Sequence, residues 1–399
     1  MYGSYGEYLR GELASIREQG LYKDERVIES PQGAEVRVGG RTILNFCANN
    51  YLGLAADPRV VDAARKALDA WGYGLSSVRF ICGTTSLHKE LEAAMSRFLG
   101  TEDTILYAAC FDANGGVFEP FMEPDTVIIT DQLNHASIID GVRLAKSKRA
   151  IYPHGDMEAL EEALRSHAEA RLRLIVTDGV FSMDGDFAKL DQICDLADRH
   201  DALVMVDDSH ATGFTGATGR GTPEKFGVTD RVDVVTTTLG KALGGALGGC
   251  TSGRKEMVEW LRQKSRPYLF SNSLPPMICA AALEVLRILE EDTGPLDRLR
   301  ANQRRLRSGL QELGFDVDAG DHPIVPVHFR RHENDAVLAQ AMSRDLLDEG
   351  IYCIGFSFPV VPRGQARIRL QASAAHAPEH VERCLEAFAK VGRKHGAIG

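Results

Sequence analysis

Short apolar runs alternate with amphipathic stretches through the first 280 or so residues of the chain. Five runs are apolar at successive positions, as expected for strands that helices cover on both faces of a sheet. Between them, apolar positions at helical spacing predict helices, for example over residues 90–99, 157–167 and 190–200. The predicted strands span residues 104–109, 126–130, 172–177, 202–207 and 232–238. This alternation predicts a mostly parallel sheet with crossover helices.

The pattern changes near residue 280. A long helical stretch covers residues 277–313, with a predicted break at Gly294-Pro295. Three further strands are predicted at residues 323–329, 351–356 and 366–370, with helices between and after them. We therefore predict an α/β protein with three parts, since 399 residues exceed one simple core. These are an N-terminal segment (1–50), a large domain with the mostly parallel sheet (51–285) and a smaller C-terminal α+β domain (286–399).

Composition and charge narrow the class of protein. Hydrophobic residues make up 44% of the chain and charged residues 26%, both typical of a globular protein. The net charge of −10 gives no indication of a nucleic-acid surface. The first residues mix charge and polarity, and no uncharged apolar run reaches the roughly 18 residues of a membrane helix. The 8 cysteines form no CxxC pair and no zinc-type spacing, so we expect reduced thiols in the cytoplasm and no metal.

One lysine lies just after a predicted strand, in the segment TTTLGKALGG at residues 236–245. The glycines allow a bulky ligand to approach the backbone, and the threonine hydroxyls are suitable donors to a phosphate group. A lysine removed from water loses its proton readily and becomes a nucleophile toward carbonyl carbons. Lys241 is therefore a candidate catalytic residue. A lysine in an ordinary glycine-rich turn explains this segment equally well by itself.

A second segment, VMVDDSH at residues 204–210, places two acids and a histidine at the end of a predicted buried strand. Ligands of open α/β sheets bind at such carboxyl ends. A lysine and a buried carboxylate together suit pyridoxal 5′-phosphate (PLP), because a carboxylate keeps the pyridine nitrogen protonated and the ring electron-accepting. We assign this role to Asp207, with His210 near the ring oxygen. The alternative for Asp207 is a helix N-cap, which Asp208 suits equally well.

Two further segments are weaker candidates. Residues 109–116, ACFDANGG, follow a strand and begin a helix, where free backbone N–H groups bind phosphate. An ordinary strand-to-helix turn explains them as well. His135, in LNHAS at residues 133–137, is placed to stack on a cofactor ring, although a lone histidine is more often structural. No GxSxG, HExxH or GxxxxGK[ST] motif is present, and Glu224 replaces the third glycine that a dinucleotide site at residues 219–224 would need.

Together these segments resemble the α-oxoamine synthase family of the fold-type I PLP enzymes, over essentially the whole chain. The resemblance is strongest at NFCANNYLGL (45–54), at residues 207–210 and 238–245, and at ARIR (366–369). It implies the fold-type I architecture and PLP as the cofactor. It also implies that Lys241 holds PLP as a Schiff base and removes the substrate's α-proton, that Asp207 pairs with the pyridine nitrogen, that His210 contacts the ring oxygen and that His135 stacks on the ring.

The resemblance also implies the remaining contacts of the cofactor. The backbone around Cys110 and Phe111, together with Thr238, would hold the phosphate. A further phosphate contact would come from the other subunit of a homodimer with shared active sites. The residues of that contact are Ser271, Asn272 and Ser273.

Three residues match those that hold the substrate carboxylate in the family, namely Asn50, Ser182 and Arg369. Ser182 also counts among the cofactor contacts. For Arg369 the physical reason is that a planar guanidinium matches a carboxylate with two parallel hydrogen bonds. Without the family, it would be interpreted as a surface arginine on an edge strand.

The segments 77–84, 133–144 and 265–274 are most similar to family members that condense glycine with acetyl-CoA. The implied products are 2-amino-3-oxobutyrate and CoA, in a reversible reaction that belongs to threonine degradation. The alternatives are sister enzymes that form 8-amino-7-oxononanoate, 5-aminolevulinate or 3-ketosphinganine, a promiscuous synthase, a PLP aminotransferase, or a PLP-fold binder without activity. The presence of both Lys241 and Asp207 argues against the last.

Overall fold

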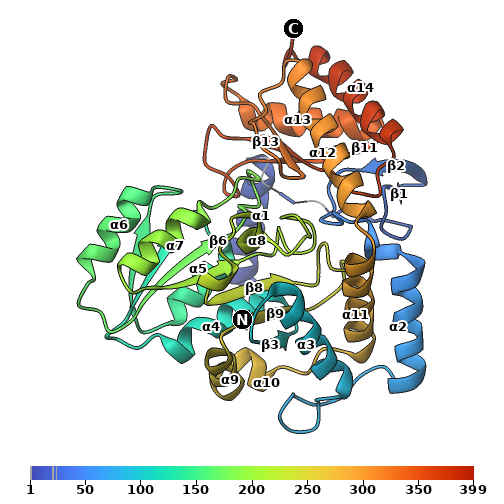
Figure 1. Cartoon of the computed structure of the whole chain (residues 1–399). Helices are drawn as coiled ribbons and strands as arrows, with labels where there is room; N and C mark the ends of the chain where they lie inside the picture. Colours follow the sequence, from blue (N-terminus) through green and yellow to red (C-terminus); the bar gives the residue numbers. More distant parts are fainter. Residues whose placement is uncertain (1, 20–21, 24) are drawn as a thin grey trace.

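The computed structural model describes residues 2–19, 22–23 and 25–399, and its centre is a seven-stranded sheet (Figure 1). The strand order is β3-β9-β8-β7-β6-β4-β5. Neighbouring strands are parallel except where β9 pairs with β3 and β8. The bounds are β3 (Asp103–Tyr107), β4 (Val127–Asp131), β5 (Lys148–Tyr152), β6 (Arg173–Asp178), β7 (Leu203–Asp207), β8 (Val234–Thr238) and β9 (Gly249–Gly253). The mostly parallel sheet predicted from the sequence is confirmed.

The five strands predicted for this sheet correspond to β3, β4, β6, β7 and β8, and the prediction missed β5 and β9. Strand β5 lies at the sheet edge and begins with the exposed residues Lys148 and Arg149, so it has no apolar run. Strand β9 has the sequence GCTSG and is buried throughout. Its small side chains let neighbouring backbones approach closely, as a Cβ at Gly249 would lie only 2.3 Å from the Cys110 nitrogen.

Helices cover the sheet and extend around it. Helix α2 (Pro58–Trp71) shows the local signals clearly: the Asp57 carboxylate accepts from the Arg59 nitrogen at 2.9 Å, and Gly72 ends the helix with φ of 75°. It lies beside α11 (Pro276–Glu291) in Figure 1. The others are α1 (Gly3–Glu18), α3 (Ser86–Leu99), α4 (Cys110–Phe121), α5 (Ala136–Leu144), α6 (Met157–Ser166), α7 (Leu190–Arg199), α8 (Thr222–Lys225), α9 (Lys255–Lys264) and α10 (Arg266–Phe270). None of the described helices is both long enough and apolar enough to cross a bilayer.

The C-terminal part builds a second layer of sheet and helices (Figure 1). An antiparallel sheet of order β10-β13-β12 is formed by β10 (Ile324–His328), β13 (Arg367–Gln371) and β12 (Ile354–Phe356). Its helices are α12 (Gly294–Glu312), α13 (Asp335–Asp348) and α14 (Pro378–Lys394). A third sheet joins β1 (Glu35–Val38) and β2 (Arg41–Asn45) to β11 (Ile351–Tyr352), so N-terminal residues pair with the C-terminal part.

Two predicted details of this part are wrong. The strand predicted over 351–356 is two strands in different sheets, separated by Cys353. The predicted helix break at Gly294-Pro295 falls instead at Asp292 and Thr293, because a proline in the first turn of α12 needs no N–H partner. The boundary predicted between residues 285 and 286 lies within α11, and the three-part division of the chain stays a prediction.

Candidate active site

The carboxyl end of β7 holds Asp207 as a buried carboxylate with both oxygens fixed. Oδ2 accepts a hydrogen bond from Asn114 Nδ2 at 2.6 Å, and Oδ1 accepts from the Ser209 nitrogen at 2.9 Å. No helix begins here, since residues 209–214 form turns, and the N-cap interpretation of Asp207 is therefore wrong. Asp208 accepts instead from the Thr222 nitrogen at 3.0 Å, at the start of α8. Asp207 is thus a preorganised acceptor at the end of the sheet.

Lys241 lies in the turns that follow β8, the neighbour of β7. Burial lowers its pKa, while the charges of Asp207 and Asp178 raise it and the charge of Arg369 lowers it further. The fold therefore brings these four side chains within electrostatic reach of one another. A lysine with a lowered pKa carries a larger share of neutral amine, the form that attacks carbonyl carbons and accepts protons.

Two histidines, His135 and His210, lie within electrostatic reach of Lys241. His210 is buried, and its Nδ1 lies 2.9 Å from the Tyr51 hydroxyl. Burial moves the His210 pKa well below its usual value, so the ring is neutral near pH 7. His135 precedes α5, and its Nδ1 lies 2.7 Å from Ser137 Oγ, which fixes the ring orientation. The rings of His135 and Phe111 meet edge to face with centroids 6.4 Å apart.

The start of α4 lies beside the same strands. Helix α4 begins at Cys110, and no side chain caps its first turn. Thr238 Oγ1 accepts from the Gly240 nitrogen at 2.9 Å and donates to the Gly248 oxygen at 3.2 Å. Gly248 in turn pairs with Ala109, so Thr238 lies next to this helix start. Backbone N–H groups of an uncapped helix start form a suitable site for phosphate, and the Thr238 hydroxyl beside them would have to turn away from the Gly248 oxygen to donate to it.

Arg369 comes from the antiparallel C-terminal sheet and lies within electrostatic reach of Lys241. It lies on β13, the central strand of its sheet, so the interpretation as an edge-strand arginine is wrong. Its Nη1 donates to the Ser182 oxygen at 2.7 Å, its guanidinium lies 5.0 Å from the Phe356 ring centroid, and its Nε is buried with no hydrogen-bond partner. Among the described residues it forms no ion pair, and burial lowers its pKa. Arg369 is half-buried, but a cation with a buried, unpaired nitrogen is costly, and an anionic ligand offsets that cost.

Comparisons with known proteins agree with this arrangement. Residues 41–388 match the family described as aminotransferase class I and II. The 2-amino-3-ketobutyrate coenzyme A ligase of Escherichia coli K12 is 55% identical over 401 residues, covering 100% of both chains. An 8-amino-7-oxononanoate synthase of Thermosipho melanesiensis is 46% identical over 97% of this chain and 98% of that protein. A variant serine palmitoyltransferase of S. paucimobilis with bound PLP–myriocin aldimine matches with a TM-score of 0.92 and 31% identity over 99% of each chain.

The chain belongs to the α-oxoamine synthase family of fold-type I PLP enzymes. Its cofactor is PLP, and the residues of the site fit that group. The buried Asp207 carboxylate suits the pyridinium nitrogen, the Lys241 amine suits the aldehyde carbon, and the uncapped start of α4 suits the phosphate.

In this α-oxoamine synthase the segment Ser271–Ser273 pairs with residues 77 and 78 of the same chain. Asn272 forms a bridge with Val78, and the Ser273 nitrogen donates to the Ser77 oxygen at 3.0 Å. Ser271 and Asn272 are exposed, and among the described residues no hydrogen bond or ion pair joins the segment to Lys241. Its predicted role in the partner's site stays a prediction.

Asn50 follows β2 and lies next to the turn after β13. It is buried, its Oδ1 accepts from the Ala55 nitrogen at 3.2 Å, and its backbone oxygen accepts from Ser373 Oγ at 2.6 Å. Through Ser373 it is tied to the turn that follows β13, the strand of Arg369. Its predicted contact with the substrate carboxylate also stays a prediction.

Sequence reasoning missed three residues that hold the α-oxoamine synthase site together. Asn114 Nδ2 donates to Asp207 and to Ser137 Oγ at 2.8 Å, and Asn114 Oδ1 accepts from Thr236 Oγ1 at 2.7 Å. Tyr51 contacts His210, and Asp178 Oδ1 accepts from the His135 nitrogen at 3.2 Å. The only sequence signal for Asn114 was its place in the segment 109–116, because nothing in the pattern shows which side chain of α4 faces β7.

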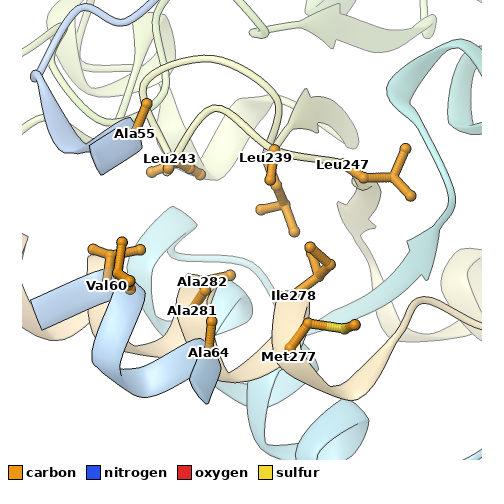
Figure 2. Close-up of a pocket in the computed structure, with 13 residues that line it drawn as sticks. Ala55, Val60, Ala64, Leu239, Leu243, Leu247, Met277, Ile278, Ala281 and Ala282 are labelled. Atoms are coloured by element: carbon orange, nitrogen blue, oxygen red, sulfur yellow. The ribbon is translucent and has the colours of Figure 1, made fainter. Parts of the chain in front are cut away.

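An apolar cavity of about 150 Å³ lies beside the turns that carry Lys241 (Figure 2). Leu239, Leu243 and Leu247 form one wall, and residues of α2 and α11 form the other, including Val60 and Ile278. No charged side chain lines it. Charged ligand groups therefore do not suit this cavity.

Proposed function

We propose that this enzyme condenses glycine with acetyl-CoA to give 2-amino-3-oxobutyrate and CoA, the glycine C-acetyltransferase reaction. The observation that carries the proposal is the 55% identity, over the full length of both chains, to a protein named 2-amino-3-ketobutyrate coenzyme A ligase. The reaction is reversible, and we propose that it serves threonine degradation in the cell, where CoA cleaves the keto acid.

The proposed chemistry divides between cofactor and chain. PLP, when bound, supplies an electron-accepting ring that stabilises negative charge on the amino-acid α-carbon. Asp207 offers a fixed carboxylate to the ring nitrogen, since Asn114 and Ser209 hold both of its oxygens. Lys241 Nζ takes the α-proton, and burial favours its neutral form by lowering its pKa. His135 covers one face of the ring, and His210 contacts the ring oxygen.

The proposed phosphate contacts come from the start of α4 and from β8. Backbone N–H groups at Cys110 and Phe111 point from an uncapped helix start, and the Thr238 hydroxyl lies beside them. The dipole of α4 adds favourable interaction with the dianion.

The proposed contacts with the substrate carboxylate are made by Arg369, Asn50 and Ser182. Arg369 carries the unused donors that a bidentate carboxylate contact needs, and the Ser182 oxygen fixes one guanidinium nitrogen. A fixed carboxylate orients the α-carbon, so that its proton faces Lys241. Glycine needs no space for a side chain, and a pocket discriminates against one added methylene by only about 1–3 kcal/mol. Use of serine or alanine should therefore be reduced but not abolished.

We also propose a homodimer in which Ser271, Asn272 and Ser273 contact the phosphate in the partner's site. Ser271 and Asn272 are exposed, and large apolar side chains next to them are exposed as well: Phe270 at 68%, Phe80 at 63% and Ile81 at 69%. Clustered apolar exposure is typical of protein interfaces. Full activity of a monomer, measured by sedimentation at the assay concentration, would contradict the proposal.

We further propose a cytoplasmic location, because all eight cysteines are free thiols.

A sister activity is the second candidate. It is favoured by the 46% identity to an 8-amino-7-oxononanoate synthase and by the structural match to a serine palmitoyltransferase. The test is CoA release for glycine, alanine and serine, each with acetyl-, succinyl- and palmitoyl-CoA. We expect the largest kcat/KM for glycine with acetyl-CoA. A tenfold preference for succinyl- or palmitoyl-CoA with any amino acid would retain the family and overturn the named reaction.

The family description also names aminotransferases, which move an amino group to a keto acid. The same CoA assay separates the two reactions, because an aminotransferase releases no CoA. Amino transfer from glycine to a keto-acid acceptor, without CoA release, would replace the proposed function.

A further inference from the structure

His154 joins two carboxylates beside the active site. Its Nδ1 lies 3.1 Å from Asp131 Oδ1, and its Nε2 lies 2.8 Å from Asp186 Oδ2. Hydrogen bonds and charges from Asp131 first and Asp186 second raise the His154 pKa to about 10. With both ring nitrogens facing acceptors, the imidazolium donates to two carboxylates at neutral pH.

This histidine links the carboxyl ends of three successive strands, and the outer two, β5 and β6, are not neighbours. His154 follows β5, Asp131 ends β4, and Asp186 lies in the loop between β6 and α7. The order β6-β4-β5 places β4 between the other two strands. The bridge therefore closes over the carboxyl end of β4 and ties together three successive loops of the sheet.

Two of these loops carry proposed site residues. Asp131 Oδ1 accepts from the Leu133 nitrogen at 2.9 Å, which shapes the loop that leads to His135. The Asp186 backbone oxygen accepts from the Phe181 nitrogen at 3.0 Å, which closes the tight turn that contains Ser182. The Phe181 ring also packs edge to face against His154 with centroids 4.3 Å apart.

We propose that His154 is a positioning residue, which holds the His135 loop and the Ser182 turn together by bridging Asp131 and Asp186. Because Ser182 fixes the Arg369 guanidinium, the bridge sets the affinity for the amino-acid carboxylate rather than the rate of the chemical step. The proposal rests on the proposed roles of His135, Ser182 and Arg369.

The surroundings of His154 indicate that its charge, rather than its size, holds the two loops together. The bridge lies at a cavity of about 210 Å³, which Tyr152 and Lys189 also line. The titratable groups that face His154 are Asp131, Asp186, Tyr152 and Lys189, and the Lys189 ammonium donates to the Gly155 oxygen at 2.9 Å. A glutamine at position 154 has room in this cavity but carries no charge.

The folded-state pKa of His154 is raised, so the bridge is complete below its usual pKa of 6.5 and is lost as pH rises through about 10.

The test uses two variants and a matched control in the holoenzyme. His154→Gln removes the cation, and Asp186→Asn removes one carboxylate while keeping its shape. His395→Gln breaks another histidine–carboxylate pair, with Asp345 at 2.7 Å, on the far α13–α14 layer. The readouts are the glycine Kd from spectral titration, the kcat at saturation, and hydrogen exchange of peptides that span residues 131–137 and 180–187.

We expect each of the two variants to raise the glycine Kd about five- to tenfold, with kcat changed less than about threefold. Faster exchange should be confined to the two loops, with β10 and β13 as the unaffected reference. The ratio of Kd between His154→Gln and wild type should be largest near pH 7 and approach one above pH 10, because both proteins then lack the cation. His395→Gln should behave as wild type.

An unchanged Kd in both variants, an equal fall in kcat at constant Kd, or faster exchange throughout the chain would each overturn the positioning role. Failure of the proposed function has a different signature. In that case wild type itself fails to bind glycine, while the exchange of the two loops still reports whether the bridge holds them.

Discussion

The two sides of the active site are built differently. On the cofactor side, Asp207 lies at the end of a seven-stranded sheet, and both of its oxygens are held by neighbouring donors. On the substrate side, Arg369 comes from a separate three-stranded sheet and has one hydrogen bond to the Ser182 oxygen. The Asp207 carboxylate has hydrogen bonds to both of its oxygens before any ligand arrives. The substrate side retains a buried donor for the ligand to satisfy.

This difference predicts that the two proposed sets of contacts respond differently to substitution. Groups that hold the cofactor are fixed by short contacts within one rigid sheet, where parallel strands align their ends. The proposed contacts with the substrate lie where the large sheet and the C-terminal sheet meet, so loops and small shifts can alter them. Changes on the cofactor side should therefore act on the chemical step, and changes on the substrate side should act on affinity.

The largest expected effect comes from Lys241→Ala. Without the amine, the purified holoenzyme should lack the absorbance near about 420 nm of the lysine-bound cofactor, and α-proton removal should fall by about 10⁴-fold. Absorbance spectra and CoA release measure the two losses. A wild-type protein that stays colourless after incubation with PLP would contradict the whole assignment.

Asp207→Asn comes next. The amide keeps the shape of the pocket but removes the negative charge, so exchange of the glycine α-proton should slow by about 100-fold or more. Proton exchange followed by NMR is the direct measurement. Near-native exchange would show that another carboxylate, such as the nearby Asp178, serves the ring nitrogen.

Arg369→Gln tests the proposed substrate contact, as Asp207→Asn tests the proposed cofactor contact. Loss of a charge-assisted, bidentate contact should raise the KM for glycine about 100-fold, with little change in cofactor binding. The matched control is Arg330→Gln, which breaks an exposed pair with Asp318 in the same part of the chain. Steady-state kinetics and PLP titration separate the two effects. If cofactor binding suffers as much as KM, the division between the two sides is wrong.

The smallest expected effect concerns His322, which joins the two sides. Its Nε2 donates to the His210 oxygen at 2.7 Å, and its Nδ1 accepts from the Ile324 nitrogen at 3.0 Å. Burial lowers its pKa to about 3, so the folded protein keeps this ring neutral while the unfolded chain binds a proton below pH 6.5. Stability should therefore fall as pH drops from 6.5 toward 3, by at most about 1.4 kcal/mol per pH unit from this group.

Urea unfolding between pH 4 and 7 provides the measurement. The His322→Gln variant should be less stable at pH 7, because it loses the paired contacts, and should show a shallower dependence on pH. A slope equal to that of wild type would mean that other histidines account for the acid sensitivity. His376, whose pKa is lowered to about 4 by burial, is the comparison to test next.

Sequence reasoning was most successful where a pattern has only one structural solution. Strands β6 and β7 contain continuous apolar runs between helical stretches, and such runs are typical of the buried centre of a parallel sheet. It failed at β9, whose small polar residues have no strand pattern, and at Cys353, where one apolar run divides between two sheets. In both cases the neighbours in space, and not the residues themselves, decide the outcome.

By itself the sequence determined the class of chemistry, because a lysine among glycines after one strand and a carboxylate at the end of another are local features. Adjacent parallel strands must then bring Lys241 and Asp207 to the same edge. Only the tertiary structure decided which side chains hold them: Asn114 against Asp207, Tyr51 against His210, and His154 between Asp131 and Asp186. These pairs join residues from 23 to 159 positions apart, so their contacts depend on how helices and loops pack over the sheet.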